Sequence, residues 1–547
     1  MIVNDILEFY RDICGERVLI LVSTTVDGLC AWKILQSLLH MDNVQYTLIP
    51  VDGKSHLESA FRTHSDQNTV IVLIDCGGNI NVSEELEPLP DSQVYVLDSH
   101  IPYDLDNIYD GDVVKVVIPE SFDLEVPRYE DIYEEDSENE DEPNRKRRRE
   151  EEEEEEDSLL PRKERWKRKR EELLFTYYEL SGYNLSVSLM IFELAWKMSK
   201  DNSQYLWWAI IGVTDQYLNC KIGRDQYVTT CGTVQQHVQR LNNHSDSTSV
   251  NQMKIKYSNE LRLDLYRHWS LMESLKHSSY TASRFRIWTS KGKKKLNEFL
   301  ADMGLPLLQC NQTFQSMDME IRREVCGWIE VTAQKYGLDD ISYGSFELQY
   351  GFKNKYCAGD VLQAVSAALT CPTLDTEAAF LRAQDTLNRS NEKLIHTGIE
   401  QSKALCCSLL NQVQAFIDMK QVVCTGPFVY AVIQEGVAEL EVFAHPSRLL
   451  RLCRYLSEAY CATTRKAAVL PFIIASALPL DPEYSCIVGV PPLSVDSNKS
   501  YLGRAFHQAA DKVNASVEFE DFEPSVMQIK SEDKAKFFDA LTALLMT

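Results

Sequence analysis

The sequence has no Cys-x-x-Cys pair among its fifteen cysteines, and Cys406 and Cys407 are adjacent. This spacing excludes a zinc ribbon and indicates no disulfide framework, so we expect a reducing compartment. The stretch from Met1 to Cys14 lacks the basic and apolar regions of a secretory signal. Long apolar runs are also missing, because Ala467 to Leu480 contains two prolines and is shorter than the ~20 residues of a membrane span. We therefore expect a soluble intracellular protein.

Positive charge is scarce as well. There are 56 lysines and arginines against 82 aspartates and glutamates, which gives a net charge of −26. The segment from Tyr129 to Glu172 has 20 acidic and 12 basic residues, net −8, which leaves −18 for the rest of the chain. Because a footprint on duplex DNA relies on clustered Lys and Arg, any nucleic-acid contact should be local. Lys291 to Lys295 is the best basic cluster elsewhere, although it is also typical of a solvated helix start.

The length of 547 residues is too great for one core, so several domains are expected. Changes in composition and pattern predict an α/β core at 1–128, a charged linker at 129–170, a helical remainder of that core at 171–283, a helical insertion at 284–400, and a second α/β domain at 401–547.

Apolar β-forming segments alternate with helical patterns in the first of these regions. Helices are predicted at Gly28 to Leu39 and around Leu57 to Phe61. The strands show no polar alternation, as expected when both faces are buried, and together these elements predict a doubly wound parallel sheet. The predicted strands are Val18 to Thr24, Val44 to Val51, Thr69 to Ile74, the segment from Gln93, and Val113 to Ile118.

Polar residues follow three of these strands, in the sequences Asp27-Gly28, Asp75-Cys76-Gly77 and Asp98-Ser99-His100. Ligand sites of open α/β sheets lie outside the carboxyl ends of the strands, so three carboxylates and one imidazole should meet at one edge. That set suits Mn or Mg, which would activate a water against a phosphoryl group. Each aspartate taken singly is more typical of a turn or a helix N-cap.

A fourth carboxylate, Asp215, ends the sequence Gly212-Val213-Thr214-Asp215. With it, the pattern resembles the DHH phosphoesterase superfamily, whose RecJ-type nucleases carry Asp-x-Asp-Gly, a strand-end Asp, Asp-His-His and a later Gly-x-x-x-Asp-like motif. Thr25 stands where that superfamily has the first Asp, and Ser99 where it has the middle His. These departures remove two ligands, so we predict no catalytic residue, no bound metal and no cofactor. The resemblance implies a relic metal pocket formed by Asp27, Asp75, Asp98, His100 and Asp215.

The remaining chain is predicted to be helical at first and mixed later. Expected helices are Leu173 to Leu180, Ser186 to Met198, Tyr205 to Leu218, Leu261 to Leu275, Arg284 to Leu300 and Glu320 to Tyr336, the last stopped by Gly337. Expected strands are Val422 to Ile433, Val437 to Phe443, Val469 to Ala475 and Cys486 to Val490, with helices at Arg448 to Tyr460, Arg504 to Val513 and Lys534 to Leu545. The carboxyl-terminal third thus predicts a separate α/β domain, and the resemblance to the DHH superfamily implies that it is of the DHH-associated type.

Longer segments resemble the cell division control protein 45 family of replication-initiation factors. The resemblance implies a non-catalytic subunit of the eukaryotic replicative DNA helicase, bound to the MCM hexameric ring and the GINS complex and needed for initiation and elongation of chromosomal replication. It further implies other replication-fork partners, including DNA polymerases, leaves single-stranded DNA open as a ligand, and implies no membrane. The alternative is a metal-dependent RecJ-like single-strand exonuclease with weak residual activity. The matching segments are Leu124 to Ile132, Leu206 to Gln216, Leu261 to Leu271, Phe299 to Leu307 and Gly503 to Phe506.

The linker contains two basic clusters around the glutamate run from Glu150 to Glu156. From Glu130 almost no apolar residue occurs until Leu159, so we predict disorder in this stretch to about Asp157. The two clusters resemble a bipartite nuclear-import signal, which predicts a nuclear protein. A charged linker whose second cluster starts a surface helix is the alternative. The import residues are Arg145, Lys146, Arg147, Arg148 and Arg149, and in the second cluster Lys167, Arg168, Lys169 and Arg170.

The segment from Arg284 to Gly337 carries more apolar groups than a lone surface helix buries, and it holds none of the candidate metal ligands. Part of them should pack on the chain's own core, and the rest should form an exposed patch that docks the MCM ring. The predicted docking residues are Phe285, Trp288, Phe299 and Leu300.

Overall fold

The amino-terminal part is built on a six-stranded sheet with the order β1-β7-β5-β4-β2-β3, in which every neighbouring pair is parallel. The predicted doubly wound parallel sheet is therefore confirmed. The predicted strands agree with the observed ones to within one residue at the ends that were specified. The observed strands are β1 Ile2–Val3, β2 Arg17–Ser23, β3 Gln45–Val51, β4 Val70–Ile74, β5 Gln93–Leu97 and β7 Val114–Val117.

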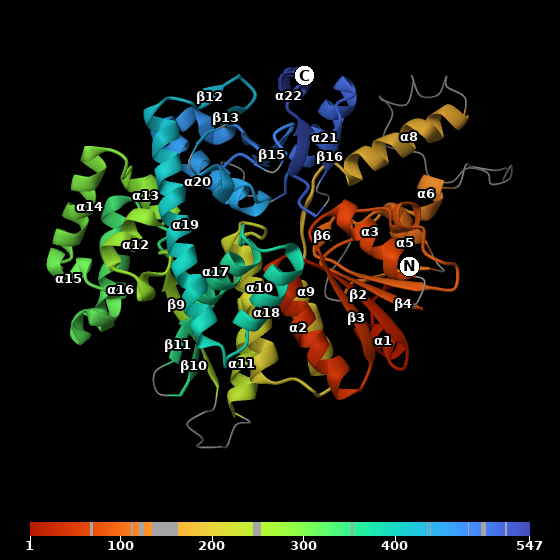
Figure 1. The fold of residues 1–547 in the computed structure, drawn as a ribbon, viewed down its shortest axis with the longest axis horizontal. Coiled ribbons are helices and arrows are strands. Elements are labelled where there is room, and N and C mark those ends of the chain that lie inside the picture. Colours follow the sequence, from red (N-terminus) through yellow and green to blue (C-terminus); the bar gives the residue numbers. More distant parts are fainter. Residues whose placement is uncertain are drawn as a thin grey trace, which may run out of the picture.

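Helices cover both faces of this sheet in the computed structural model (Figure 1). Alternate residues of β2 face opposite sides, with Val18, Ile20 and Val22 in one core and Leu19 and Leu21 in the other. The first face is covered by α1 Ile6–Ile13, α2 Val26–Met41, α9 Val187–Lys197 and α10 Ser203–Leu218. The second face is covered by α3 Lys54–His64, α4 Val82–Leu86, α5 Leu105–Tyr109, α6 Tyr129–Tyr133 and α8 Arg162–Tyr177.

The structure describes the whole chain except residues 66–68, 111–112, 120–124, 134–161, 244–252, 352–353, 435, 438, 480, 494–498, 520–521 and 547. The first import cluster, Arg145 to Arg149, and residues 134–157 of the predicted disordered segment lie outside the described residues. The start of that segment is described, and there the prediction is wrong, because Tyr129–Tyr133 form helix α6. The second cluster lies in α8, which crosses the predicted linker boundary at residue 170. The second cluster therefore forms part of a helix, which leaves the import prediction untested. No helix in the described ranges is long and apolar enough to cross a membrane.

The middle of the chain is less uniformly helical than predicted. The expected helix from Leu261 to Leu275 is wrong, because Leu261 ends β9 and the short helix η2 precedes α12. The expected helix from Arg284 to Leu300 is also wrong, because α13 ends at Phe285, where Arg286 is left-handed, and α14 begins at Ser290. The region 284–400 also contains two strands, since β10 and β11 form an antiparallel sheet with β9. The elements are α11 Arg224–Asn243, β9 Lys254–Leu261, η2 Tyr266–His268, α12 Leu271–His277, α13 Ser279–Phe285, α14 Ser290–Asp302, α15 Leu307–Asn311, η3 Phe314–Ser316, α16 Met319–Ala333, η4 Gln334–Tyr336, β10 Ser342–Tyr350 and β11 Asn354–Cys357.

Three further helices join the middle of the chain to both α/β units. Helix α17 Ala358–Leu369 packs against α10 and against the long helix α19 Glu392–Asp418, and α18 Thr376–Thr386 lies beside β3. Helix α19 in turn contacts α20 of the last domain and α12, and in Figure 1 it is the long upright helix beside them. The region predicted as one insertion therefore contributes to the cores of both units.

The carboxyl-terminal domain contains a second six-stranded sheet, of mixed direction, in the order β12-β13-β14-β15-β17-β16. Helix α20 covers one face, and α21 and α22 cover the other. The strand expected at Val437 to Phe443 is wrong, because this stretch ends in the short helix η5. The elements are β12 Val423–Cys424, β13 Val429–Ile433, η5 Leu440–Phe443, α20 Pro446–Thr463, η6 Arg465–Val469, β14 Phe472–Ala477, β15 Tyr484–Val490, α21 Leu502–Val513, β16 Val517–Phe519, β17 Val526–Lys530 and α22 Lys534–Met546.

Candidate functional site

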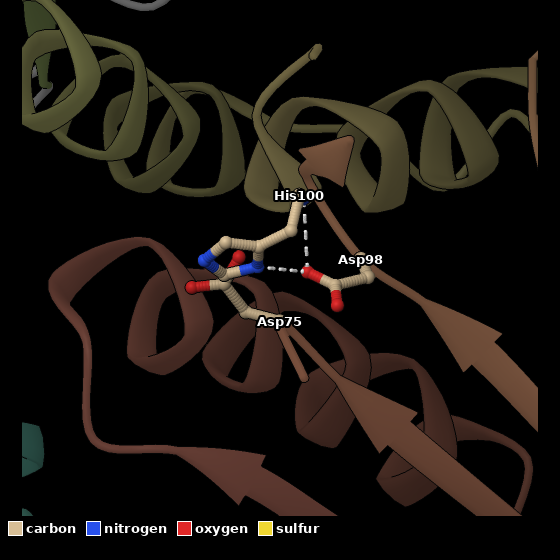
Figure 2. A group of neighbouring side chains, drawn as sticks. All are labelled: Asp75, Asp98 and His100. Carbon is tan, nitrogen blue, oxygen red and sulfur yellow. Dashed lines mark hydrogen bonds and ion pairs between the residues drawn. The ribbon is translucent and has the colours of Figure 1, made fainter. Parts of the chain in front are cut away.

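Two neighbouring strands bring three of the predicted site residues together. Asp75 follows β4, and Asp98 and His100 follow β5, which pairs with β4 in parallel so that Ile74 lies opposite Leu97. Each of the three side chains offers a ligand atom within 4.8 Å of the other two, and all three are buried. Figure 2 shows the His100 ring bonded to Asp98, with Asp75 beside it. The predicted meeting of these groups at the carboxyl edge of the sheet is confirmed.

Asp98 and His100 form a tight pair. Asp98 Oδ1 accepts hydrogen bonds from His100 Nδ1 at 2.5 Å and from the His100 backbone N–H at 3.2 Å, and Oδ2 accepts from the Gly78 N–H at 2.7 Å. A Cβ at Gly78 would lie 2.8 Å from Asp98 Oδ2, so glycine permits this approach. Burial opposes both charges, but the Asp98 carboxylate raises the pKa of His100 to about 9, and His100 lowers the pKa of Asp98.

Asp75 accepts hydrogen bonds from Thr25 and Ser99, the two residues that depart from the nuclease motifs. The Thr25 hydroxyl donates to Asp75 Oδ2 at 2.5 Å, and the Ser99 hydroxyl donates to Asp75 Oδ1 at 2.8 Å. Asp75 itself is held in a left-handed conformation with φ of 56°, and its N–H donates to the Leu97 carbonyl at 2.7 Å. Burial raises the pKa of Asp75. The two departing positions have therefore replaced possible metal ligands with hydrogen-bond donors to a carboxylate.

Asp27 lies inside a helix and not in a turn after the first strand. Thr25 is the N-cap of α2, so the helix begins before Asp27 and before Gly28, which was expected to open it. The Asp27 carboxylate accepts from the backbone N–H groups of Val187 at 2.8 Å and Ser188 at 3.1 Å, and from the Ser186 hydroxyl at 2.6 Å. These donors form the amino end of α9, where the helix dipole favours an anion. Asp27 therefore joins α2 to α9.

Gly212 explains the glycine of the last predicted motif. A Cβ there would lie 2.1 Å from Ser188 Oγ and 2.3 Å from Asp27 Oδ1, so helix α10 can approach the junction of α2 and α9 only with glycine at this position. The motif's aspartate, Asp215, lies further along α10 and is also buried. All five retained residues of the predicted pocket are thus buried around the carboxyl end of the sheet.

Lys221 is the member of this site that the sequence did not indicate. Its Nζ lies 3.8 Å from Asp215 Oδ2, while Asp215 Oδ1 accepts from Asn219 Nδ2 at 2.8 Å. Burial alone would lower the pKa of Lys221, but nearby carboxylates, Asp215 first and then Glu523, raise it. A single lysine after a predicted helix carries no signal of its own, since only the fold brings it to the carboxylates.

A cavity of about 340 Å³ adjoins the pocket from the side of the carboxyl-terminal domain. Its described lining includes Thr25, Asp215 and Lys221, together with Arg454 of α20 and Glu523. Asp75, Asp98 and His100 are not part of this lining, and each is at most 2% exposed. A phosphodiester in the cavity would therefore meet Lys221 and Asp215 before the three clustered groups.

The pocket residues do not fit the metal centre of the nuclease superfamily. A two-metal site needs carboxylate oxygens that can be shared between ions about 3.5 to 4 Å apart. Both oxygens of Asp27, Asp75 and Asp98 already accept hydrogen bonds from the chain. An ion bound to these oxygens would have to share them with the donors already present, and Thr25 and Ser99 supply hydroxyl donors where the motifs of the superfamily supply a carboxylate and an imidazole. The arrangement holds the fold together, and we derive no hydrolytic step from it.

The predicted docking residues are not available to a partner. Phe285, Trp288, Phe299 and Leu300 are between 0% and 8% exposed and belong to a core shared with α19 and α20. The prediction that they form an exposed patch is wrong, because α13 and α14 turn their apolar faces towards α20 and the rest of this core. Other apolar residues of the same segment are exposed instead, namely Leu307 and Leu308 of α15 and Met319, Trp328 and Val331 of α16.

Comparison with known proteins identifies the family. The CDC45 family model matches residues 18–126 and 123–544. The chain belongs to the CDC45 family. The cell division control protein 45 homolog of Mus musculus is 39% identical over 557 residues, and that of Homo sapiens is 38% identical, each match covering 98% of both chains. The crystal structure of CDC45 from Entamoeba histolytica has the same fold, with a TM-score of 0.73 and 24% identity over 100% of both chains.

Family membership confirms the resemblance drawn from the sequence. The homologues support a role in DNA replication. The match runs through both α/β units and through the helices between them.

Proposed function

We propose that this chain is a non-catalytic subunit of the eukaryotic replicative DNA helicase, assembled with the MCM hexameric ring and the GINS complex. The observation that carries the loss of catalysis is the pair of hydroxyls on Asp75, from Thr25 and Ser99. They satisfy the carboxylate that an active site would offer to a metal ion. Membership of the CDC45 family supports the role in replication.

A nuclease assay tests the loss of catalysis. Purified protein is incubated with 5′-labelled single-stranded DNA and Mn or Mg, and we expect no shortening of the strand. Asp98→Asn is the matched control, because it keeps the size of the side chain but removes the carboxylate that binds His100. Degradation by the wild type that Asp98→Asn abolishes would contradict the proposal and favour the RecJ-like exonuclease.

Docking on the helicase is proposed for the exposed residues of α15 and α16. Leu308 is 80% exposed and Val331 is 78% exposed, and exposed apolar side chains of this kind mark protein interfaces. The buried residues Cys310 of α15 and Val325 and Ile329 of α16 fix both helices to the core. Replacing the whole segment with a linker would open that core, so point substitutions are the sharper test.

The docking test compares charged substitutions at exposed apolar residues of α15 and α16 with one at an exposed valine of α11. Val331→Glu together with Leu308→Glu should abolish co-elution with MCM and GINS, since charge in an apolar interface is costly. Val228→Glu on α11 is the matched control, because Val228 is 60% exposed but lies far along the chain from α15 and α16. Loss of co-elution with the control alone, or retention with the double variant, would place the interface elsewhere.

Nuclear localisation is also part of the proposal. Lys167, Arg168 and Lys169 are exposed on α8, as an import receptor requires, although Lys169 also pairs with Asp131 at 2.7 Å. Neutralising both basic clusters should remove nuclear accumulation of a fluorescent fusion. Unchanged accumulation would show that import uses other residues or a partner.

A further inference from the structure

Lys221 lies beside Asp215 in the lining of the cavity between the two α/β units. It lines that cavity, its side chain is only 11% exposed, and its ammonium lies 3.8 Å from Asp215 Oδ2. The ammonium also lies 4.9 Å from the centre of the Tyr183 ring, a distance that permits a cation–π contact. The Lys221 side chain thus lies where a ligand in the cavity would enter the pocket.

The groups around Lys221 come from both units. Tyr183 of β8 Gly182–Tyr183 packs against the His100 ring at 4.9 Å, and its hydroxyl donates to Glu523 Oε2 of the carboxyl-terminal domain at 2.7 Å. Glu523 lines the same cavity as Lys221. A single tyrosine therefore connects His100, Lys221 and Glu523.

The buried carboxylates of the pocket need a positive charge nearby to compensate them. Four carboxylates, those of Asp27, Asp75, Asp98 and Asp215, are buried with at most 4% exposure. Buried charges are costly unless they are paired, and in metal-dependent enzymes the bound ion is often the largest compensating charge. Here the compensating groups are His100, which binds Asp98, and Lys221, which faces Asp215.

We propose that the Lys221 ammonium is the resident cation of this pocket, that it excludes a divalent metal ion, and that it holds the carboxylates of the amino-terminal unit against Glu523 of the carboxyl-terminal domain. The inference rests on the proposed non-catalytic function and states how the pocket keeps its charge balance without a metal. Lys221 is a positioning residue in this role.

Manganese binding tests the inference directly. Mn²⁺ alone is titrated into the full-length wild type, Lys221→Met and Lys221→Arg, with free Mn²⁺ followed by electron paramagnetic resonance. We expect no stoichiometric binding to the wild type or to Lys221→Arg, and one ion bound at least 10-fold more tightly to Lys221→Met. Lys200→Met is the matched control, because Lys200 pairs with Asp42 away from the pocket, and it should behave like the wild type.

Two results would overturn the inference: stoichiometric binding to the wild type, or equal binding to Lys221→Met and Lys221→Arg. If Lys221→Met does not fold, Asp215→Asn is added to it, since removing the carboxylate should restore folding if the two charges compensate each other. Continued failure to fold would also overturn the inference. The binding readout separates this inference from the proposed function. Metal binding by the wild type without nuclease activity would refute only the role of Lys221. Nuclease activity of the wild type would refute the proposed function.

Discussion

The pocket at the sheet edge and the exposed surface of α15 and α16 differ in what their side chains contact. In the pocket, each of the carboxylates Asp27, Asp75 and Asp98 receives at least two donors from the chain itself. On α15 and α16, apolar side chains such as Leu308 and Val331 are left in water. The first region uses its carboxylates to bind other parts of the chain, and we propose that the second binds another molecule.

The difference teaches where to look for function in a fold that resembles an enzyme. Polar groups at strand ends indicate a site only if their lone pairs remain available to a ligand. Here those lone pairs join α2 to α9 and β4 to β5, so substitutions in the pocket should change stability. Substitutions on α15 and α16 should change assembly and leave stability almost unaltered.

The largest effect is expected at Gly212. Gly212→Ala places a Cβ within 2.3 Å of Ser188 Oγ and Asp27 Oδ1, and we expect it to lower the free energy of unfolding by about 3 kcal/mol or more. Gly232→Ala is the matched control, since no atom lies within 4 Å of its added Cβ on α11, and it should raise stability by up to about 1 kcal/mol. Urea denaturation of both variants checks the pair. Similar values for the two would show that α10 does not pack tightly on the pocket.

The pH dependence should report the His100 pair. The pKa of His100 is raised to about 9 in the folded chain from an ordinary 6.5, so its stabilisation is complete below pH 6.5 and is lost as the pH rises through 9. The loss corresponds to about 3 kcal/mol. We expect the melting temperature of the wild type to fall over this range more steeply than that of His100→Asn. Parallel curves would mean that His100 is neutral in the fold.

Smaller effects are expected from the hydroxyls on Asp75. Ser99→Ala removes one donor and should reduce stability by about 1 to 2 kcal/mol. Thr25→Val should reduce it more, because Thr25 also caps α2 through the Gly28 N–H. Thermal denaturation measures both. A larger loss of stability in Ser99→Ala than in Thr25→Val would indicate that the N-cap at Thr25 contributes little to stability.

The smallest effect is expected on the exposed surface. Val331→Ser should change the free energy of unfolding by less than about 0.5 kcal/mol, because the side chain is already in water. Phe299→Ala, in the adjacent core, should reduce it by about 3 kcal/mol or more. Denaturation of both variants checks the contrast, and a large effect of Val331→Ser would mean that α16 packs differently.

Local patterns in the sequence determined the parallel sheet and most of its helices. Strands such as Val70–Ile74 are continuous apolar segments bounded by turns, so they can be identified without knowing their neighbours. The same reasoning placed Asp75, Asp98 and His100 together, because the carboxyl ends of parallel strands share an edge. This reasoning failed for Leu261 to Leu275 and for Val437 to Phe443. These stretches contain short elements, so no hydrophobic period of one helix or one strand runs through them.

Only the tertiary structure decided what the pocket residues do. Asp27 meets the N–H of Val187 from 160 positions away, and Lys221 meets the ring of Tyr183, which precedes α9 and α10 in the chain. Phe299 of α14 is likewise buried because it packs against Phe285 and Tyr336, whereas Val331 of α16 faces water. Hydrophobic period is a property of neighbouring residues, whereas hydrogen-bond partners and exposure are set by segments far apart in the chain.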